Sequence, residues 1–465
     1  MKSPYLPTSL FLPLVASFFL ALIASCATLP HVGELEREKL PHVGEIPEIV
    51  GPAGKLPIEQ TKSLLRRFEW RMLPAEDLAQ HLLLMEKITG EPITAGNHVD
   101  LLIDGREAFP TMLEAISKAR SSINFETFIF SDDAIGRQFA AVLARKAAEG
   151  VEVRLLYDSF GSLRTPSAFF SALRDQGVKV VEFNALNPFK PHRLERRLNY
   201  RDHRKLLIVD GNVAFAGGIN ISQYYGSGSM PSAGGSLPWR DTHVRITGPA
   251  VSEFQSLFLQ MWAVENGPEA PDRKYFPYLE MRGKALLSVL GNTPGERNRL
   301  SYVAYVSAIN RAKYSVYITA AYFIPTQELR ESLMRAAKRG VDVRIVLPGP
   351  TDSKLALYAG RYYYEELLSA GIKLYTRKGE MLHAKTAVID GIWSLIGSTN
   401  LDLRSALFNY EISALILCPQ FGNKLEDLFA TDIAFSDEIT LPEWSVRPAG
   451  EKFKEWHAHL LSRWL

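Results

Sequence analysis

The chain has 465 residues, and its 53 Lys and Arg side chains nearly balance its 51 Asp and Glu side chains, for a formal net charge of +2. A balance this even argues against a nucleic-acid-binding protein, which concentrates positive charge. Only two cysteines, Cys26 and Cys418, are present, so the fold cannot rest on a disulfide framework.

The N-terminus has the pattern of a secretory signal. Lys2 supplies one positive charge, an apolar stretch runs from Leu10 to Ile23, and small residues precede Cys26. So short an apolar run is typical of a cleaved signal peptide, here residues 1–25, rather than a membrane span. The arrangement resembles a bacterial lipobox, in which Cys26 is lipidated and becomes the mature N-terminus; an uncleaved anchor, or ordinary secretion with an incidental Cys26, are the alternatives. We therefore expect a lipid-anchored protein of the bacterial cell envelope that faces the periplasm.

Residues 26–58 show no helical or strand period. They are rich in Pro, Gly and Glu, and Leu-Pro-His-Val-Gly-Glu occurs twice, at 29–34 and 40–45. This composition predicts a flexible tether that holds the folded body off a membrane.

The body shows the same order of elements twice. Helical and extended patterns alternate in both halves, which predicts two α/β units, each a mostly parallel sheet with helices on both faces. We place them at residues 59–280 and 281–465. The expected helices and strands of the first unit are 108–119, 122–130, 135–148 and 151–157, and those of the second are 303–312, 315–320, 329–338 and 341–346.

One polar motif is also duplicated, at a constant offset of 180 residues. In each copy an apolar, β-branched run ends at Asp-Gly, which predicts a buried strand followed by a turn. Residues i and i+2 of a strand share a face, so the His and Lys of each copy project together. The copies are His203, Lys205, Asp210, Gly217, Gly218 and Asn220 in the first half, and His383, Lys385, Asp390, Gly397, Ser398 and Asn400 in the second.

Two such imidazole–ammonium pairs, brought together, provide a nucleophile, a general acid/base and two fixed cations. These groups suffice for phosphoryl transfer, in which positioning and charge stabilisation do most of the work. A single His-x-Lys is usually an ordinary surface pair. Two copies with identical polar residues favour a duplicated site over a repeat of the fold alone.

At these residues the chain resembles the phospholipase D superfamily, whose signature is H-x-K-x4-D followed by G-[GS]-x-N. The resemblance implies two pseudo-two-fold-related repeats with one shared active site, a phosphohistidine intermediate, and neither a metal nor another cofactor. It also implies His203 as nucleophile and His383 as acid/base, with only a modest preference for this order. A single chain holds both motifs, so a monomer is sufficient for the site.

The resemblance extends to the residues around each histidine. Glu411, which follows His383, and Asp241, which follows His203, are similar to the carboxylates that pair with the motif histidines; a surface salt bridge is the alternative for either. Asn220, Asn400 and Ser398 are expected to bind phosphate through side-chain donors, with Gly217, Gly218 and Gly397 keeping the backbone close. Asp210 and Asp390 are motif members with an expected structural role.

The flanking sequence resembles the bacterial cardiolipin synthase family. The segments that carry this likeness are 199–211, 239–251, 126–130 and 322–325. The implied reaction joins two phosphatidylglycerols and releases glycerol. A hydrolytic phospholipase D that releases phosphatidic acid is the main alternative, and a non-catalytic binding module or nuclease is a third.

The chain departs from the commonest members of that family, which have two N-terminal membrane helices. It looks more like a shorter, peripheral branch, whose partners are a phospholipid substrate and a membrane surface, with no nucleic acid. The basic and apolar segment 187–198 either presses on that surface or is a solvated loop.

Overall fold

The computed structural model describes residues 29–39, 45–67, 75–90, 93–186, 199–226, 239–266, 275–295 and 299–465. The expected signal peptide, Cys26 and the segment 187–198 lie outside these ranges. Within them, no helix combines the length and the hydropathy needed to cross a bilayer.

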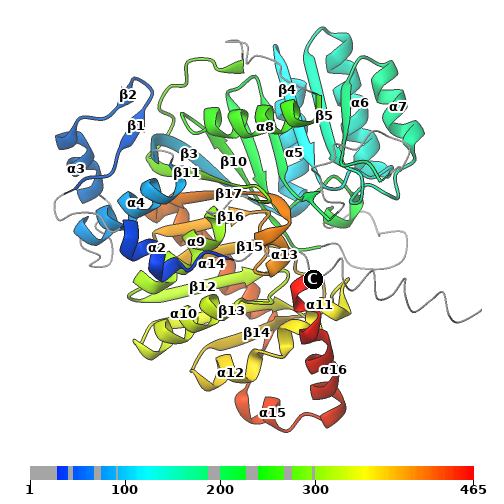
Figure 1. The fold of residues 1–465 in the computed structure, drawn as a ribbon. Helices are drawn as coiled ribbons and strands as arrows, with labels where there is room; N and C mark the ends of the chain where they lie inside the picture. Colours follow the sequence, from blue (N-terminus) through cyan, green and yellow to red (C-terminus); the bar gives the residue numbers. More distant parts are fainter. Residues whose placement is uncertain are drawn as a thin grey trace, which may run out of the picture.

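Each half of the body is built on a seven-strand sheet, and the two sheets have the same order of strands. Figure 1 shows the first half mostly in cyan and green and the second half in yellow, orange and red. In the first repeat the order is β6 (Lys179–Phe183), β5 (Glu152–Asp158), β4 (Ser122–Thr127), β8 (Lys205–Val209), β9 (Val213–Gly217), β10 (Thr242–Thr247) and β3 (Ile93–Ile103). In the second it is β14 (Lys373–Arg377), β13 (Asp342–Pro348), β12 (Ser315–Ala320), β15 (Lys385–Ile389), β16 (Trp393–Gly397), β17 (Asn409–Leu417) and β11 (Ala285–Asn292).

Among the seven strands of each sheet, parallel pairing is confined to the first three. There the connections are helical, through α6 (Ala134–Ala148) in the first repeat and α10 (Gln327–Lys338) in the second. The remaining pairs are antiparallel. The prediction of mostly parallel sheets is therefore wrong, although the two α/β repeats are as predicted. The motif strands turn back at Asp-Gly, where a positive φ at both residues makes a tight hairpin.

Helices cover both faces of each sheet. The first repeat has α5 (Asp104–Ser117), α6, α7 (Ser167–Asp175) and α8 (Val251–Asn266). The second has α9 (Leu300–Arg311), α10, α11 (Lys354–Arg361), α12 (Tyr364–Ser369), α13 (Leu403–Leu407), α14 (Pro419–Ala434), α15 (Leu441–Ser445) and α16 (Ala449–Leu460). Strand β18 (Ser436–Ile439) extends the second sheet beside β14.

The two sheets are held together in two ways. Strand β3 pairs with β10 of the first repeat and with β11 of the second, so the hydrogen-bonded ladder is continuous. A single apolar cluster also contains side chains of both motif hairpins, among them Leu206 and Ile208 from the first and Val388 and Ile396 from the second. Burying this shared face fixes the ends of β8 and β15 relative to one another.

The N-terminal part of the chain folds onto the second repeat. Helix α2 (Val32–Lys39) and helix α4 (Ala75–Thr89) share an apolar core with α9, and Figure 1 shows them beside it in blue. Strands β1 (Ile49–Gly51) and β2 (Gly54–Lys55) extend the sheet from β3. Helix α3 (Ile58–Arg66) follows them.

The prediction of a flexible tether is thus wrong for the described part of residues 26–58. Val32 and Ile49 are completely buried there. The boundary at residue 59 does not separate two structural units either, because α4, which follows it, packs in the same apolar core as α2 and α9. Helix α2 and strands β1 and β2 are too short to show a period in the sequence, and tertiary packing stabilises them.

Candidate active site

Each motif histidine precedes the strand that carries its lysine, and its backbone is anchored on the opposite repeat. The amide of His203 donates to the carbonyl of Tyr410 at 2.9 Å, and the amide of His383 donates to the carbonyl of Arg240 at 2.8 Å. Strand β7 (Arg201–Asp202) pairs with the start of β17, which continues the first of these contacts. The main chain of each half therefore sets the position of the other half's histidine.

The imidazole–carboxylate pairs cross between the repeats in the same way. Nδ1 of His203 lies 3.1 and 3.0 Å from the two carboxylate oxygens of Glu411, and Nδ1 of His383 lies 2.7 Å from Oδ2 of Asp241. Both carboxylates are fully buried. The two predicted carboxylates are thus the partners of the two histidines, but each pairs with the histidine of the other half. A carboxylate at Nδ1 fixes the tautomer and leaves Nε2 for a substrate.

Residues predicted to bind phosphate instead hold these carboxylates. The hydroxyl of Ser398 donates to Glu411, as does the side-chain amide of Asn409. A Cβ at Gly218 would lie 2.1 Å from Oδ1 of Asp241, so only glycine leaves room for that carboxylate. Ser398 is therefore placed to orient Glu411. Ser398 itself is buried and does not line the cavity.

The other two motif glycines allow close packing of strands. A Cβ at Gly217 would lie 2.5 Å from the carbonyl oxygen of Thr242, and one at Gly397 would lie 2.3 Å from that of Ile412. Neither glycine lines the cavity. Gly217 thereby keeps its hairpin against β10, which begins directly after Asp241, and Gly397 keeps its hairpin against β17, which carries Glu411.

The two lysine ammonium groups lie beside the histidines. Nζ of Lys205 donates to the carbonyl of His203 at 2.6 Å and lies 5.2 Å from the centre of the Phe128 ring. Nζ of Lys385 lies 3.0 and 3.1 Å from the ring nitrogens of His383 and also contacts that residue's carbonyl. Both lysines are buried, so their charges act at short range through little water.

Both histidines open into one cavity of ≈ 500 Å³ between the repeats. Asn220 and Asn400, which are predicted to bind phosphate, line it too. The amide nitrogen of Asn220 donates to the hydroxyl of Tyr225 at 2.7 Å, whereas Oδ1 of Asn400 is buried without a partner. The cavity is large enough to hold one phosphodiester headgroup against both imidazoles.

Several residues that line the cavity lie outside the duplicated motif and were not predicted as site residues. Aromatic rings pack on the imidazoles, Phe128 on His203 at 5.0 Å and Trp239 and Tyr225 on His383 at 5.1 and 5.5 Å between ring centres. The hydroxyl of Tyr322 donates to Asp352 at 2.6 Å on the same wall. Phe128, Trp239 and Tyr322 sit in the flanking segments that carry the family likeness, but Tyr225 could not be found from spacing. The remaining wall includes Phe160, Arg201, Arg404, Asp402, Asn409 and Leu465.

Burial shifts the acid–base properties of the site. It lowers the pKa of His203 to about 4, against the opposing effect of Glu411, and it lowers the pKa of His383 well below the usual value. Burial likewise lowers the pKa of Lys205 to about 7 and that of Lys385 to about 8. Burial therefore favours neutral imidazoles, and the two ammonium groups give up protons unusually easily.

The two carboxylates differ. Burial raises the pKa of Asp241 to about 6, although Lys385 opposes this shift. The pKa of Glu411 is lowered, because its contacts with His203, Lys205 and Ser398 outweigh the effect of burial. The His203–Glu411 pair thus holds the firmer negative charge.

Asp210 and Asp390 are at the other end of their strands from the histidines. Asp210 accepts hydrogen bonds from the amides of 120, 121 and 122, and Asp390 accepts them from the amides of 313, 314 and 315. Each carboxylate joins the motif hairpin to the start of the neighbouring strand. The structure thus places both in a scaffolding position.

Comparison with known proteins agrees with this geometry. A family model described as "Cardiolipin synthase, PLD-like domain" matches residues 112–229 and 305–433. A cardiolipin synthase of Listeria monocytogenes is 37% identical over 387 residues, which cover 82% of this chain and 78% of the relative. The chain belongs to the cardiolipin synthase family of phospholipase D-like proteins. The expected class of enzyme, a phosphatidyltransferase of the cardiolipin synthase type, is confirmed at this level.

Other members and neighbours fit the same assignment. The cardiolipin synthase of Geobacillus thermodenitrificans is 34% identical over 385 residues, with 82% of this chain and 75% of the relative covered. The crystal structure of phosphatidylserine synthase from Haemophilus influenzae superposes with a TM-score of 0.63 at 13% identity and covers 82% of this chain and 98% of that one. At that identity the likeness supports the fold of this cardiolipin synthase family member and nothing further.

Proposed function

We propose that the protein transfers the phosphatidyl group of one phosphatidylglycerol to a hydroxyl of a second, forming cardiolipin and releasing glycerol. The observation that carries this proposal is the crossed arrangement of the site. Two imidazoles, each held at Nδ1 by a carboxylate of the opposite repeat, line one cavity. A phosphodiester between them can be attacked on one side while its leaving group is protonated on the other.

In the first half-reaction, Nε2 of His203 attacks phosphorus. A P–N bond forms as the bond to the glycerol oxygen breaks, and His383 donates a proton to that oxygen. Glu411 stabilises the positive charge that develops on His203. The products are free glycerol and a phosphatidyl group on His203.

The second half-reaction is the reverse with a new alcohol. His383, now neutral, takes the proton of the acceptor hydroxyl, whose oxygen attacks phosphorus and displaces His203. Protons balance over the cycle, because His383 regains what it donated. Lys205, Lys385, Asn220 and Asn400 stabilise the negative charge on the phosphoryl oxygens in both steps.

The charge state of the empty site suits this order of events. A neutral His203 is the form that a nucleophile requires. Entry of the phosphodiester brings a negative charge that raises the pKa of His383, and so permits it to hold the proton for the leaving group. Four groups of the chain supply the charge stabilisation, and we propose that catalysis is metal-independent.

The cavity wall also favours an anionic lipid. Arg201 and Arg404 lie on it, and Tyr322 with Asp352 offers a polar patch for alcohol groups. A second phosphatidylglycerol matches both features, since it carries a phosphodiester and two free hydroxyls. The volume admits a headgroup, so we propose that the acyl chains stay at a membrane surface.

Hydrolysis is the second candidate, because water can replace the acceptor alcohol in the second half-reaction and release phosphatidic acid from His203. Purified protein incubated with phosphatidylglycerol vesicles, with the lipids then resolved, tests the proposal. Cardiolipin with free glycerol supports transfer, phosphatidic acid supports hydrolysis, and unchanged lipid contradicts both. A parallel incubation with EDTA should leave the rate unchanged; loss of turnover that Mg²⁺ or Ca²⁺ restores would contradict metal independence.

We also propose that the protein is anchored by lipid on Cys26 and works as a monomer at the periplasmic face of the bacterial envelope. The small residues before Cys26 support the anchor. Metabolic labelling with a fatty acid should mark the wild-type chain and not Cys26→Ser. Equal labelling of the variant would contradict the anchor without affecting the catalytic proposal.

A further inference from the structure

Two acidic side chains that the mechanism does not use lie buried beside the first motif histidine. Glu126 is on β4, Asp202 is on β7 directly before His203, and both side chains are completely buried. Their carboxyl groups are in hydrogen-bonding contact with one another. Among the described residues, no other N–H or O–H group donates to either oxygen of Glu126 or to Oδ2 of Asp202. An ionised carboxylate can only accept, so this contact requires a proton on one of the two groups.

The charges around this acidic pair lead to the same count. Nη1 of Arg204 lies 3.9 Å from a carboxyl oxygen of the pair. Two further cations have carboxylates of their own. Arg201 lies 3.7 Å from Asp158, and the charge of Lys205 is opposed by that of Glu411. One guanidinium thus faces two carboxyl groups, and this buried trio is neutral only when the pair holds one proton.

Burial acts in the same direction. It raises the pKa of Glu126 and raises that of Asp202 well above its ordinary value, although the charge of Arg204 opposes both shifts. Two carboxyl groups in contact cannot both ionise readily, since each charge disfavours the other. A single shared proton is therefore the stable state of the pair.

Arg204 connects the acidic pair to the carboxylate that holds His203. Its Nε donates to the carbonyl of Glu411 at 3.3 Å, and its two terminal nitrogens reach carbonyls of α8 and β11 at 3.5 and 3.4 Å. Glu411 in turn holds Nδ1 of His203. Because Arg204 and Glu411 belong to different repeats, the arginine fixes the second repeat's carboxylate against the first repeat's histidine.

The second repeat lacks this charge arrangement at the equivalent positions, which the structure describes. By strand pairing and the offset of 180 residues, the counterparts of the acidic pair and its arginine are Thr319, Leu382 and Ala384. Leu382 and Ala384 belong to an apolar cluster. The charged unit therefore supports one histidine only, the one to which the proposed function assigns the phosphatidyl group.

We propose that Glu126 and Asp202 share one proton, and that the pair acts through Arg204 to position the carboxylate–imidazole pair of the nucleophile. These three side chains are positioning residues, since none of them lines the catalytic cavity. The positioning role rests on the proposed transferase function, whereas the shared proton does not depend on it.

Infrared difference spectroscopy of the purified full-length protein tests the shared proton at about pH 8, where ordinary carboxyl groups are ionised. We expect the carbonyl stretch of a protonated carboxyl group in wild type. Glu126→Gln and Asp202→Asn should each lose it, because an amide N–H then replaces the proton. Asp158→Asn removes another fully buried carboxylate and should keep the band. No band in wild type, or a band that survives in both amide variants, would overturn the proposal.

Cardiolipin formation by the same variants tests the positioning role. Glu126→Gln keeps one negative charge beside Arg204 and should change kcat by less than about threefold. The double variant Glu126→Gln/Asp202→Asn leaves the guanidinium without a counter-charge. It should lower kcat by more than about tenfold, with KM changed by less than about threefold, because the nucleophile is misplaced while the cavity is intact.

Arg204→Met gives a second route to the same test if the double variant does not fold. It removes the buried charge together with the contact to Glu411, and kcat should again fall by more than about tenfold with little change in KM. A kcat of the folded variant within about threefold of wild type would overturn the positioning role. A wild type that shows the infrared band and makes no cardiolipin would contradict the proposed function and leave the shared proton standing.

Discussion

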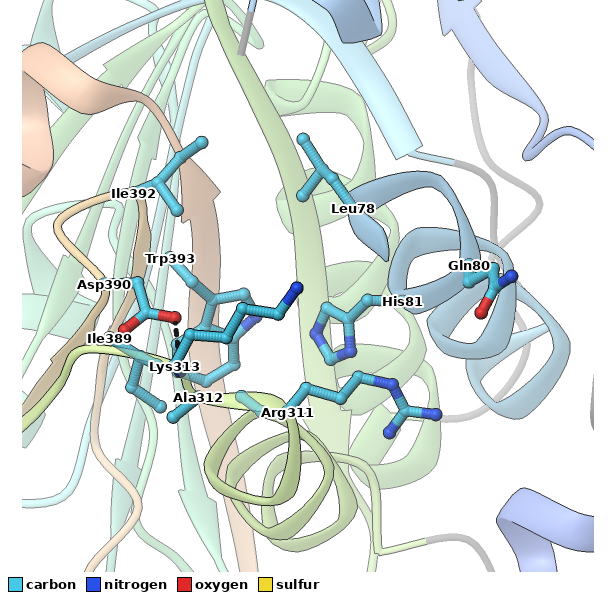
Figure 2. A pocket seen from close by; sticks show the side chains of 11 residues that line it. Leu78, Gln80, His81, Arg311, Ala312, Lys313, Ile389, Asp390, Ile392 and Trp393 are labelled. Atoms are coloured by element: carbon cyan, nitrogen blue, oxygen red, sulfur yellow. Dashed lines mark hydrogen bonds between the residues drawn. The ribbon is translucent and has the colours of Figure 1, made fainter. Parts of the chain in front are cut away.

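The two ends of the motif hairpins have diverged to very different degrees between the repeats. At the histidine end, both repeats present an imidazole, a buried ammonium, an amide and a carboxylate in equivalent places. At the aspartate end, the first repeat is packed shut by Tyr275 and Pro277, whereas the second borders a pocket between α4 and the end of α9, which Figure 2 shows. The two histidine ends are alike because they line one cavity, whereas the two aspartate ends lie apart and differ in their surroundings.

The histidine end is not symmetric in detail. One pair is His203 with a glutamate, steadied by Ser398; the other is His383 with an aspartate, beside Gly218. Glu411 has a lowered pKa and Asp241 a raised one. A firmly charged carboxylate suits the histidine that becomes a phosphohistidine, and a more easily protonated one suits the histidine that passes protons. The asymmetry thus agrees with the proposed roles.

Removing either imidazole should have the largest effect. We expect His203→Ala and His383→Ala each to lower kcat for cardiolipin formation by more than about 10³-fold, because the nucleophile or the proton donor is lost. Acid-free trapping with labelled lipid should show phosphatidyl-enzyme in wild type and none in His203→Ala. Substantial turnover in either variant would contradict the shared site.

The carboxylates should separate the two roles. We expect Glu411→Gln and Asp241→Asn to lower kcat about 10²-fold or more, since each disturbs the tautomer of its histidine. With a phosphatidyl ester of p-nitrophenol, whose leaving group needs no proton, release of p-nitrophenol by Asp241→Asn should recover and that by Glu411→Gln should not. The reverse pattern would show that His383 is the nucleophile and His203 the acid/base.

The lysines predict a dependence on pH. The pKa values of about 7 for Lys205 and about 8 for Lys385 lie far below the ordinary range, so the empty site loses ammonium charge as pH rises through these values. We expect kcat/KM to fall by more than about tenfold between pH 8 and pH 9.5, because kcat/KM reports the free enzyme. The bound phosphodiester stabilises the ammonium groups, so kcat should hold to higher pH. A kcat/KM that stays flat to pH 9.5 would contradict the assignment.

The motif aspartates should affect folding more than catalysis. Asp210→Ala and Asp390→Ala each leave three backbone amides without an acceptor, which should lower the free energy of unfolding by about 2–3 kcal/mol. Asp390 is the more buried, so its loss should cost more. Urea titrations measure this, with the Asn variants as conservative controls. A kcat of the folded Ala variants more than about tenfold below wild type would instead indicate a role in the reaction.

Much of the site followed from the sequence because the chemistry is local. His203 and Lys205 share a strand face by spacing alone, and the constant offset to His383 and Lys385 identifies a second copy. The helices and strands around β4 and β12 were predictable for the same reason, since each carries its own period. Asn220 and Asn400 reach the cavity as their motif position indicated.

What was missed depends on how the repeats meet. Counting along the chain assigned Glu411 to His383, but packing of the two sheets exchanges the partners. Ser398 donates a hydrogen bond to Glu411 on the neighbouring strand, and the spacing of the motif does not predict this contact. The Asp-Gly turn after each motif strand indicates that the next strand is antiparallel. Nothing in the sequence pattern indicates the order of the strands beyond that turn. Residues 32–39 form a helix because the second repeat gives them a surface to pack on, and residues 49–51 form a strand because they pair with β3.

The central claim is that both imidazoles contact one phosphorus atom. A crystal structure of the protein with vanadate, which takes the geometry of the phosphoryl group in transfer, tests it most directly. The account predicts one vanadate per chain, bonded to Nε2 of His203, within hydrogen-bond distance of Nε2 of His383 and close to both lysine ammonium groups. A vanadate bound to one histidine with the other ring out of reach would contradict it.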